Sequence, residues 1–174
     1  MTTSQNEEVS EYLHTLSDFE RISDHALNLA ESAKELNDKD VRFSDYAKRE
    51  LDVLFAAVCQ IISMTITAFC EKDLKLASRV EPLEEVVDEL CDKMKMNHVE
   101  RLQQGICTIS QGFVFNDIVT NCERVSDHCS NIAAAMIELS GDAFQTHKYV
   151  HNLQEKETPE FREAYEEYIR RFAL

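Results

Sequence analysis

The sequence predicts an all-α protein, an antiparallel up-down bundle of four long helices followed by a short C-terminal helix. The chain of 174 residues contains only three glycines and two prolines, so little interrupts its helical segments. Apolar residues recur at steps of three and four, and strand-like alternation is lacking. We expect a single domain over 1–174, with a core bundle at about 5–140 and a C-terminal extension over 141–174 that ends in a short helix.

The first two predicted helices cover about 5–36 and 44–70. Ser4 followed by Glu7 has the spacing of a capping box, and the segment NDKD at 37–40 ends the first helix. The second helix is apolar nearly all round, and its run 54–70 reaches the lower length limit of a membrane span. Because this run contains polar residues and lacks aromatic or basic flanks, we interpret it as the most buried helix of a soluble bundle.

The third predicted helix covers about 73–103, with a kink or local break at Pro82, and Gly105 ends that stretch. The fourth covers about 108–139. The short C-terminal helix begins at Thr158-Pro159, an N-cap residue followed by proline at the first helical position, and ends near Phe172. Apolar residues of the fourth helix step by four and three and predict a packing seam: Ile118, Cys122, Val125, Cys129, Ile132 and Met136.

The chain is strongly acidic, with a net charge of −15. This balance argues against binding to nucleic acid or to an anionic membrane surface, and it favours cations or basic proteins as partners. The six cysteines form no C-x-x-C pair, and no signal peptide precedes them. We therefore expect buried, reduced thiols in a cytoplasmic protein.

One stretch of eleven residues occurs twice. ERISDHALNLA begins at Glu20, and ERVSDHCSNIA begins at Glu123; seven of the eleven positions are identical. Most of the identical residues are polar or charged, whereas a repeat that only preserved packing would keep its apolar positions. The repeat therefore points to a function on a polar helix face.

The repeat places carboxylates one helical turn apart. Glu123, Asp127 and Asn131 form a stripe opposite the packing seam, and Glu20, Asp24 and Asn28 repeat it. The third helix carries a stripe of its own: Glu81, Glu85, Asp88 and Asp92. Such crowded carboxylates repel unless solvent or a cation relieves them, and oxygen ligands suit iron, magnesium and zinc. All three stripes lie near mid-helix, so they can converge on one or two surface grooves; the alternative is an ordinary solvated face.

The histidines are assigned less directly. His25 and His128 lie further round their helices than the carboxylates. For them, and for Arg21 and Arg124, we favour hydrogen bonds either to metal ligands or between helices over metal ligation. His147 and His151 have the i, i+4 spacing of a metal pair, but their polar surroundings favour plain solvated histidines.

At the repeated stretches the sequence resembles the PhoU family of phosphate-uptake regulators, over residues of about 10–140. Ser23 and Ser126 stand where the family usually has glycine. The resemblance implies a PhoU-like helical domain whose E(D)-x-x-x-D motifs hold a multinuclear iron or zinc cluster on the surface. The implied metal ligands are Glu20, Asp24, Glu123 and Asp127, with Glu81, Glu85 and Asp88 from EPLEEVVDEL. Other divalent cations also suit carboxylate oxygens.

The resemblance implies regulation of phosphate uptake or phosphate signalling rather than catalysis. The implied partner is a phosphate transporter or a signalling kinase; a homodimer stays open, and neither nucleic acid nor direct membrane insertion is expected. A full-length family member has two three-helix repeats, whereas here one repeat is joined by a single motif-bearing helix. That organisation resembles the C-terminal cytoplasmic domain of bacterial sodium/phosphate cotransporters, with the membrane part upstream, and favours one metal cluster over two.

Two alternatives stay open at this point. One is a metal-free helical scaffold whose acidic stripes are merely solvated. The other is a ferritin-like di-iron oxidase, which needs Glu-x-x-His pairs that point into the bundle. Only Glu11 and His14 have that spacing, so the ligand set of an oxidase is incomplete.

Overall fold

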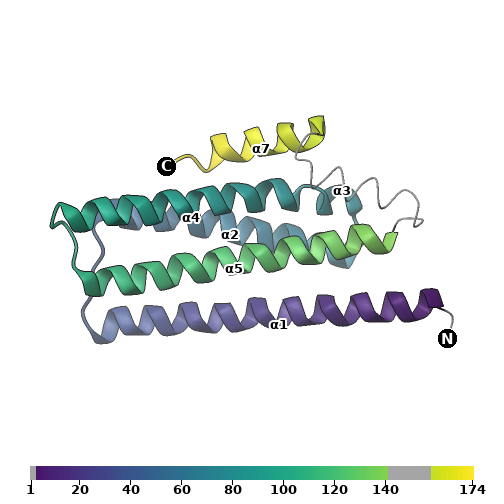
Figure 1. The fold of residues 1–174 in the computed structure, drawn as a ribbon, viewed down its shortest axis with the longest axis horizontal. Coiled ribbons are helices and arrows are strands. Elements are labelled where there is room, and N and C mark those ends of the chain that lie inside the picture. Colours follow the sequence, from purple (N-terminus) through teal and green to yellow (C-terminus); the bar gives the residue numbers. More distant parts are fainter. Residues whose placement is uncertain (1–2, 141–157) are drawn as a thin grey trace.

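The computed structural model describes residues 3–140 and 158–174, and all regular structure in these ranges is helical, as predicted (Figure 1). The described elements are α1 (Thr3–Asp38), α2 (Asp45–Glu71), α3 (Leu74–Ala77), α4 (Val80–Gln103), α5 (Ile109–Ser140) and α7 (Pro159–Arg171).

The four long helices run antiparallel in chain order, and α5 is the central one. Figure 1 shows α5 between α1 and α4, with α2 behind them and α7 along the outer side of α4. Helix α5 packs against α1, α2 and α4, so α2, α4 and α5 form a three-helix core to which α1 is added. The ring of Phe19 on α1 also meets Phe69 on α2 edge-on, with 5.2 Å between ring centroids.

Side-chain hydroxyls cap the starts of two helices, and the cap at Thr158 is the one that the sequence predicts. The Ser44 hydroxyl accepts a hydrogen bond from the Ala47 backbone N–H at the start of α2, and Thr158 does the same for Phe161 at the start of α7. The prediction for the first helix is wrong in detail. Helix α1 already includes Thr3, so Ser4 lies inside the helix and does not precede it as a cap.

The predicted third helix is two helices, α3 and α4, separated at Ser78 and Arg79. Asp73 caps α3 by accepting a hydrogen bond from the Leu76 backbone N–H. Pro82 is the third residue of α4, where the missing N–H would have no partner in the helix. Proline is therefore tolerated in the first turn of α4, and the chain breaks just before it.

The core is built around the predicted seam of α5. All six seam residues are buried, with relative exposures from 0 to 9%. They pack with apolar residues of α2 and α4, among which Leu54, Ile61, Leu83 and Val87 are fully buried. The seam prediction is therefore confirmed.

Helix α2 is less enclosed than we expected. Among the described residues it is the one helix long and apolar enough to cross a membrane by length and composition, and 33% of its most apolar stretch is buried. One face packs against α4 and α5, while Phe55 and Ile66 on the other face are exposed. The interpretation of α2 as the most buried helix is therefore wrong, because only one of its apolar faces meets the bundle.

The cysteines also divide by helix face. Cys91, Cys122 and Cys129 are buried, and burial raises the pKa of each thiol. Cys59 and Cys70 are exposed on α2, which corrects the expectation that all six thiols are buried.

A buried polar cluster lies where α2, α4 and α5 meet, toward the α4–α5 turn. The Arg101 guanidinium lies 2.8 Å from the Glu50 carboxylate, and both residues are more than nine-tenths buried. The Asn97 side chain donates a hydrogen bond to the other carboxylate oxygen of Glu50, at 2.7 Å. Arg101 and His98 both lie against the ring of Phe115, so the charged pair is enclosed by packing.

Candidate metal centre

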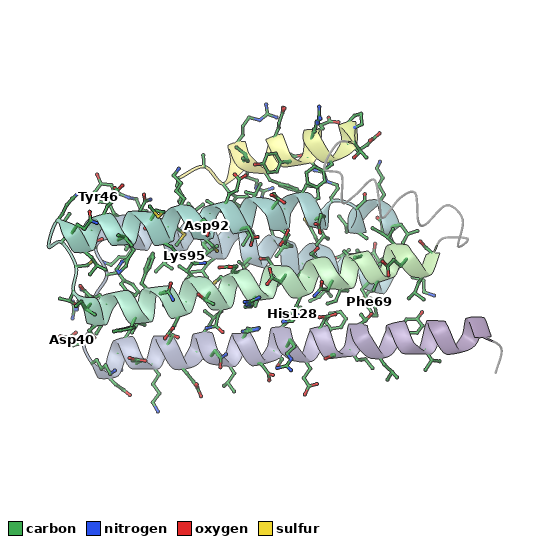
Figure 2. The ribbon with its side chains drawn as sticks, in the orientation of Figure 1. Asp40, Tyr46, Phe69, Asp92, Lys95 and His128 are labelled. Atoms are coloured by element: carbon green, nitrogen blue, oxygen red, sulfur yellow. The ribbon has the colours of Figure 1, made fainter. Side chains whose placement is uncertain are left out.

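The two copies of the repeated stretch face each other where α1 packs along α5. The Nδ1 atom of His25 lies 2.8 Å from the Asn121 side-chain oxygen, and that of His128 lies 2.9 Å from the Asp18 carboxylate. The two imidazole rings stack with 5.6 Å between centroids. Figure 2 places His128 in this interface. Because both acceptors are oxygens, Nδ1 is the donor in each bond.

These hydrogen bonds obey an approximate two-fold symmetry. Asp18 and Asn121 each stand two positions before the glutamate of their copy. The asparagine of each copy bonds to the same acceptor as the histidine of that copy. Asn28 donates to Asn121 at 3.0 Å, and Asn131 donates to Asp18 at 3.5 Å. The histidine and asparagine of the motif therefore join two antiparallel helices. The prediction of inter-helix hydrogen bonds for the two histidines is confirmed.

Acidic side chains gather where α4 packs along α5, and we call this line of carboxylates the acidic groove. It brings together Glu84, Asp88 and Asp127, whose nearest carboxylate oxygens all lie within 4.8 Å of one another. Glu84 and Asp88 are one turn apart on α4, and Asp127 approaches from the antiparallel α5. Among the residues the structure describes, no other trio of such side chains meets this closely.

Burial and mutual repulsion both disfavour ionisation in the acidic groove. Burial, followed by the charge of Asp88, raises the pKa of Glu84 to about 8. Burial, followed by the charges of Asp127 and Glu123, raises the pKa of Asp88 to about 6. Without a cation, the cluster therefore holds a proton on Glu84 near neutral pH.

Protein donors occupy both ends of the acidic groove. At one end the Ser130 hydroxyl donates to Glu81. At the other end the Lys95 ammonium donates to Glu123 at 2.5 Å, and Figure 2 shows Lys95 on the α5 side of α4. The exposed Arg124 pairs with one oxygen of Asp127, at 3.1 Å.

The structure brings together part of the predicted ligand set. Asp88 and Asp127 lie in the cluster, Glu81 and Glu123 lie at its ends with protein donors, and the charge of Glu85 acts on both Glu84 and Asp88. Glu20 and Asp24 are exposed on α1 and are not part of the cluster. Three other predictions lie outside the described side chains: those for His147, His151 and the Glu11/His14 pair.

Sequence reasoning missed Glu84, although a signal was present. Glu84 and Asp88 have the same E-x-x-x-D spacing as Glu20 and Asp24 and as Glu123 and Asp127. The sequence analysis grouped the acidic residues of the third predicted helix into one stripe, which included Glu81 and Glu85 but left out Glu84. The pairing of α4 with α5 decides which of these neighbours faces Asp127.

The chemistry of the acidic groove fits a hard or borderline metal ion. One oxygen of Asp88, Oδ1, is buried and has no hydrogen-bond partner in the described part of the chain. A buried oxygen without a donor is costly, and a cation is the partner that carboxylates accept best. Glu84, Asp88 and Asp127 together provide oxygen ligands of the kind that iron, zinc or magnesium use.

Fold and site define a class of protein: an all-helical bundle that carries a repeated E-x-x-x-D motif and an acidic groove between two antiparallel helices. A family model, described as the PhoU domain, matches residues 51–136, from α2 to α5. The chain belongs to the PhoU family.

Two curated relatives are similar to the chain. A protein of Thermotoga maritima described as "Phosphate-specific transport system accessory protein PhoU homolog 1" is 31% identical over 120 residues, which cover 69% of this chain and 51% of the relative. A PhoU homolog of Deinococcus radiodurans with the same kind of description is 25% identical over 121 residues, which cover 70% and 55%. The chain thus spans about half the length of these relatives. No solved structure matches it significantly.

Proposed function

We propose that this chain is a regulatory, non-catalytic domain that controls phosphate uptake or phosphate signalling. It does so in the cytoplasm, through contact with a phosphate transporter or a signalling partner, and it binds iron or zinc in the acidic groove. Family membership and relatives described as accessory proteins of phosphate transport support the regulatory role. The resemblance to a cotransporter's C-terminal domain is part of the same proposal, and the adjoining coding sequence tests it.

The observation that carries metal binding is the meeting of three carboxylates, one of which has a buried oxygen without a hydrogen-bond donor among the described residues. Glu84, Asp88 and Asp127 would hold the ion. A bound cation neutralises the repulsion in the acidic groove and links α4 to α5, so metal occupancy would stiffen this face of the bundle. We do not include Glu20 and Asp24 in this centre, because they lie on α1 away from it.

Replacing Asp127 with asparagine is expected to lower metal affinity by about tenfold or more, because it removes one of three anionic ligands. The measurement is metal content after loading with Fe²⁺ or Zn²⁺, together with titration calorimetry. The matched control is Asp117→Asn, which changes an exposed carboxylate on the same helix. Equal metal content in all three proteins would contradict the proposed centre.

The same experiment separates the alternatives. Stoichiometric metal that is lost in Asp127→Asn while helicity is retained supports the metal-binding regulator. Absence of metal after loading leaves a metal-free helical scaffold. Oxygen-dependent oxidation of bound Fe²⁺ would favour a di-iron oxidase instead.

A face of α1 supports the proposed partner contact. The two-fold relation between α1 and α5 makes Leu16 the equivalent of Val119, and Tyr12 the equivalent of Phe115. Val119 and Phe115 are buried in the core, whereas Leu16 is 63% and Tyr12 is 41% exposed. Leu13 and Leu27 extend this uncovered apolar stripe. We propose that a helix of the transporter or signalling partner covers it, with a basic residue opposite the nearby Glu20 and Asp24.

Replacing Leu16 with glutamate is expected to abolish regulation without unfolding the domain. Leu16 is exposed, so its change should shift the melting temperature by no more than about 2 °C, while a charge in an apolar contact would weaken partner binding. The measurement is phosphate uptake by cells that lack the gene and carry either form. The control is Lys34→Glu, an exposed change on the same helix. Wild-type uptake with Leu16→Glu would contradict the contact.

A further inference from the structure

Lys95 is a cation that the fold itself places in the acidic groove. Its side chain is 31% exposed, and its ammonium lies 2.5 Å from Glu123 and 4.0 Å from Asp92. Burial lowers the pKa of Lys95, but the hydrogen bond and the charge of Glu123 outweigh burial and raise it. Lys95 is therefore charged at all physiological pH values and is held against Glu123 from the opposite helix.

The packing of α4 against α5 places three sets of contacts one after another along the acidic groove, and we call these sets levels. Ser130 meets Glu81 at the first level, and Lys95 meets Glu123 at the third. The trio of Glu84, Asp88 and Asp127 occupies the level between them. Glu123 lies one helical turn before Asp127 on α5, beside the trio, so it becomes an available ligand when it no longer pairs with Lys95.

We propose that the Lys95 ammonium, by pairing with Glu123, keeps this carboxylate from binding metal. The acidic groove is thereby limited to one metal ion, bound by Glu84, Asp88 and Asp127. The inference rests on the proposed metal function and refines it. Two metal ions in one cluster lie about 3.5–4 Å apart and need bridging or additional carboxylates. An ammonium that already hydrogen-bonds to Glu123 removes that ligand and repels a second cation.

The decisive variant is Lys95→Met, which keeps the apolar stem and removes the charge. Zinc alone serves as the probe, with bound metal measured by elemental analysis and calorimetry. We expect about one Zn²⁺ per wild-type chain and about two per Lys95→Met chain, because Glu123 becomes available for a second ion. The double variant Lys95→Met/Glu123→Gln should return to about one.

Two controls isolate the position of the charge. Lys93→Met removes an equal charge from an exposed site on α4 and should leave stoichiometry at about one. Lys95→Arg keeps the cation and should also bind about one ion, which covers the case that Lys95→Met folds poorly. Circular dichroism of each zinc-free protein verifies the fold.

The outcomes distinguish this inference from the proposed function. If Lys95→Met binds the same number of zinc ions with the same affinity as wild type, the inference is overturned and the metal centre stands. Two zinc ions in the wild type would also overturn it. If neither wild type nor Lys95→Met binds zinc, the proposed metal function fails, and the inference fails with it.

Discussion

Replacing Glu50 with alanine is expected to lower the free energy of unfolding by about 3–5 kcal/mol. Arg101 is 8% exposed, and its guanidinium has Glu50 as its ion-pair partner, at 2.8 Å. Removing the carboxylate leaves a buried charge uncompensated and also deprives Asn97 of its acceptor. Loss of the Glu50 carboxylate should therefore weaken the contact between α2 and α4 at this end of the bundle.

Urea denaturation followed by circular dichroism measures this effect. The double variant Glu50→Leu/Arg101→Met is the informative comparison, because replacing both partners by apolar residues of similar size should recover most of the loss. Asp52→Ala, an exposed change two positions further along α2, serves as the control and should cost under about 0.5 kcal/mol. A cost below about 1 kcal/mol for Glu50→Ala would contradict the buried pair.

Stability of the metal-free protein is expected to fall as pH rises from about 5 to about 8, and Glu84 is the main cause. Its carboxyl has a pKa of about 8 in the folded protein, against 4.5 in the unfolded chain. Between these values the folded state holds a proton that the unfolded state does not, so raising the pH favours unfolding. Because Glu84 is partly exposed, solvent screening reduces the effect to about 1–2 kcal/mol.

Glu84→Gln should remove most of that pH dependence and stabilise the metal-free protein at pH 8.5. Thermal unfolding at pH 5.5 and 8.5, in the presence of a chelator, measures both effects; a difference of 1–2 kcal/mol corresponds to about 3–8 °C. Glu100→Gln, an exposed change on the same helix, should leave the pH dependence intact. An identical pH profile for wild type and Glu84→Gln would show that repulsion in the acidic groove does not limit stability.

The helices themselves were predictable because their signals are local. Apolar steps of three and four, scarce glycine and the Thr158-Pro159 start all act within a few residues. The break at Ser78 and Arg79 was harder to place. Proline is compatible with the first turn of a helix as well as with a kink, and local sequence does not choose between them; in the structure α4 begins at Val80, so Pro82 lies in its first turn.

The metal centre was only partly predictable, for a geometric reason. Spacing shows that Glu84, Glu85 and Asp88 share a broad side of α4, but not which of them faces α5. The position of α4 relative to α5 along the helix axes decides which side chains meet. Asp127 meets Glu84 and Asp88, whereas Glu123 meets Lys95. A lysine eleven residues after Glu84 shows no relation to Glu123 until the helices are packed.

The sequence alone determined the helical class, the core seam of α5 and the presence of a repeated polar motif, since each depends on periodicity within a segment. Tertiary structure decided which residues of the repeated motif join helices and which enter the acidic groove. Histidine and asparagine turn toward the partner copy and join α1 to α5, whereas Asp127 turns toward α4. The glutamate and aspartate of the first copy remain exposed on α1. The physical reason is that one helix has several faces, and only packing assigns each face its neighbour.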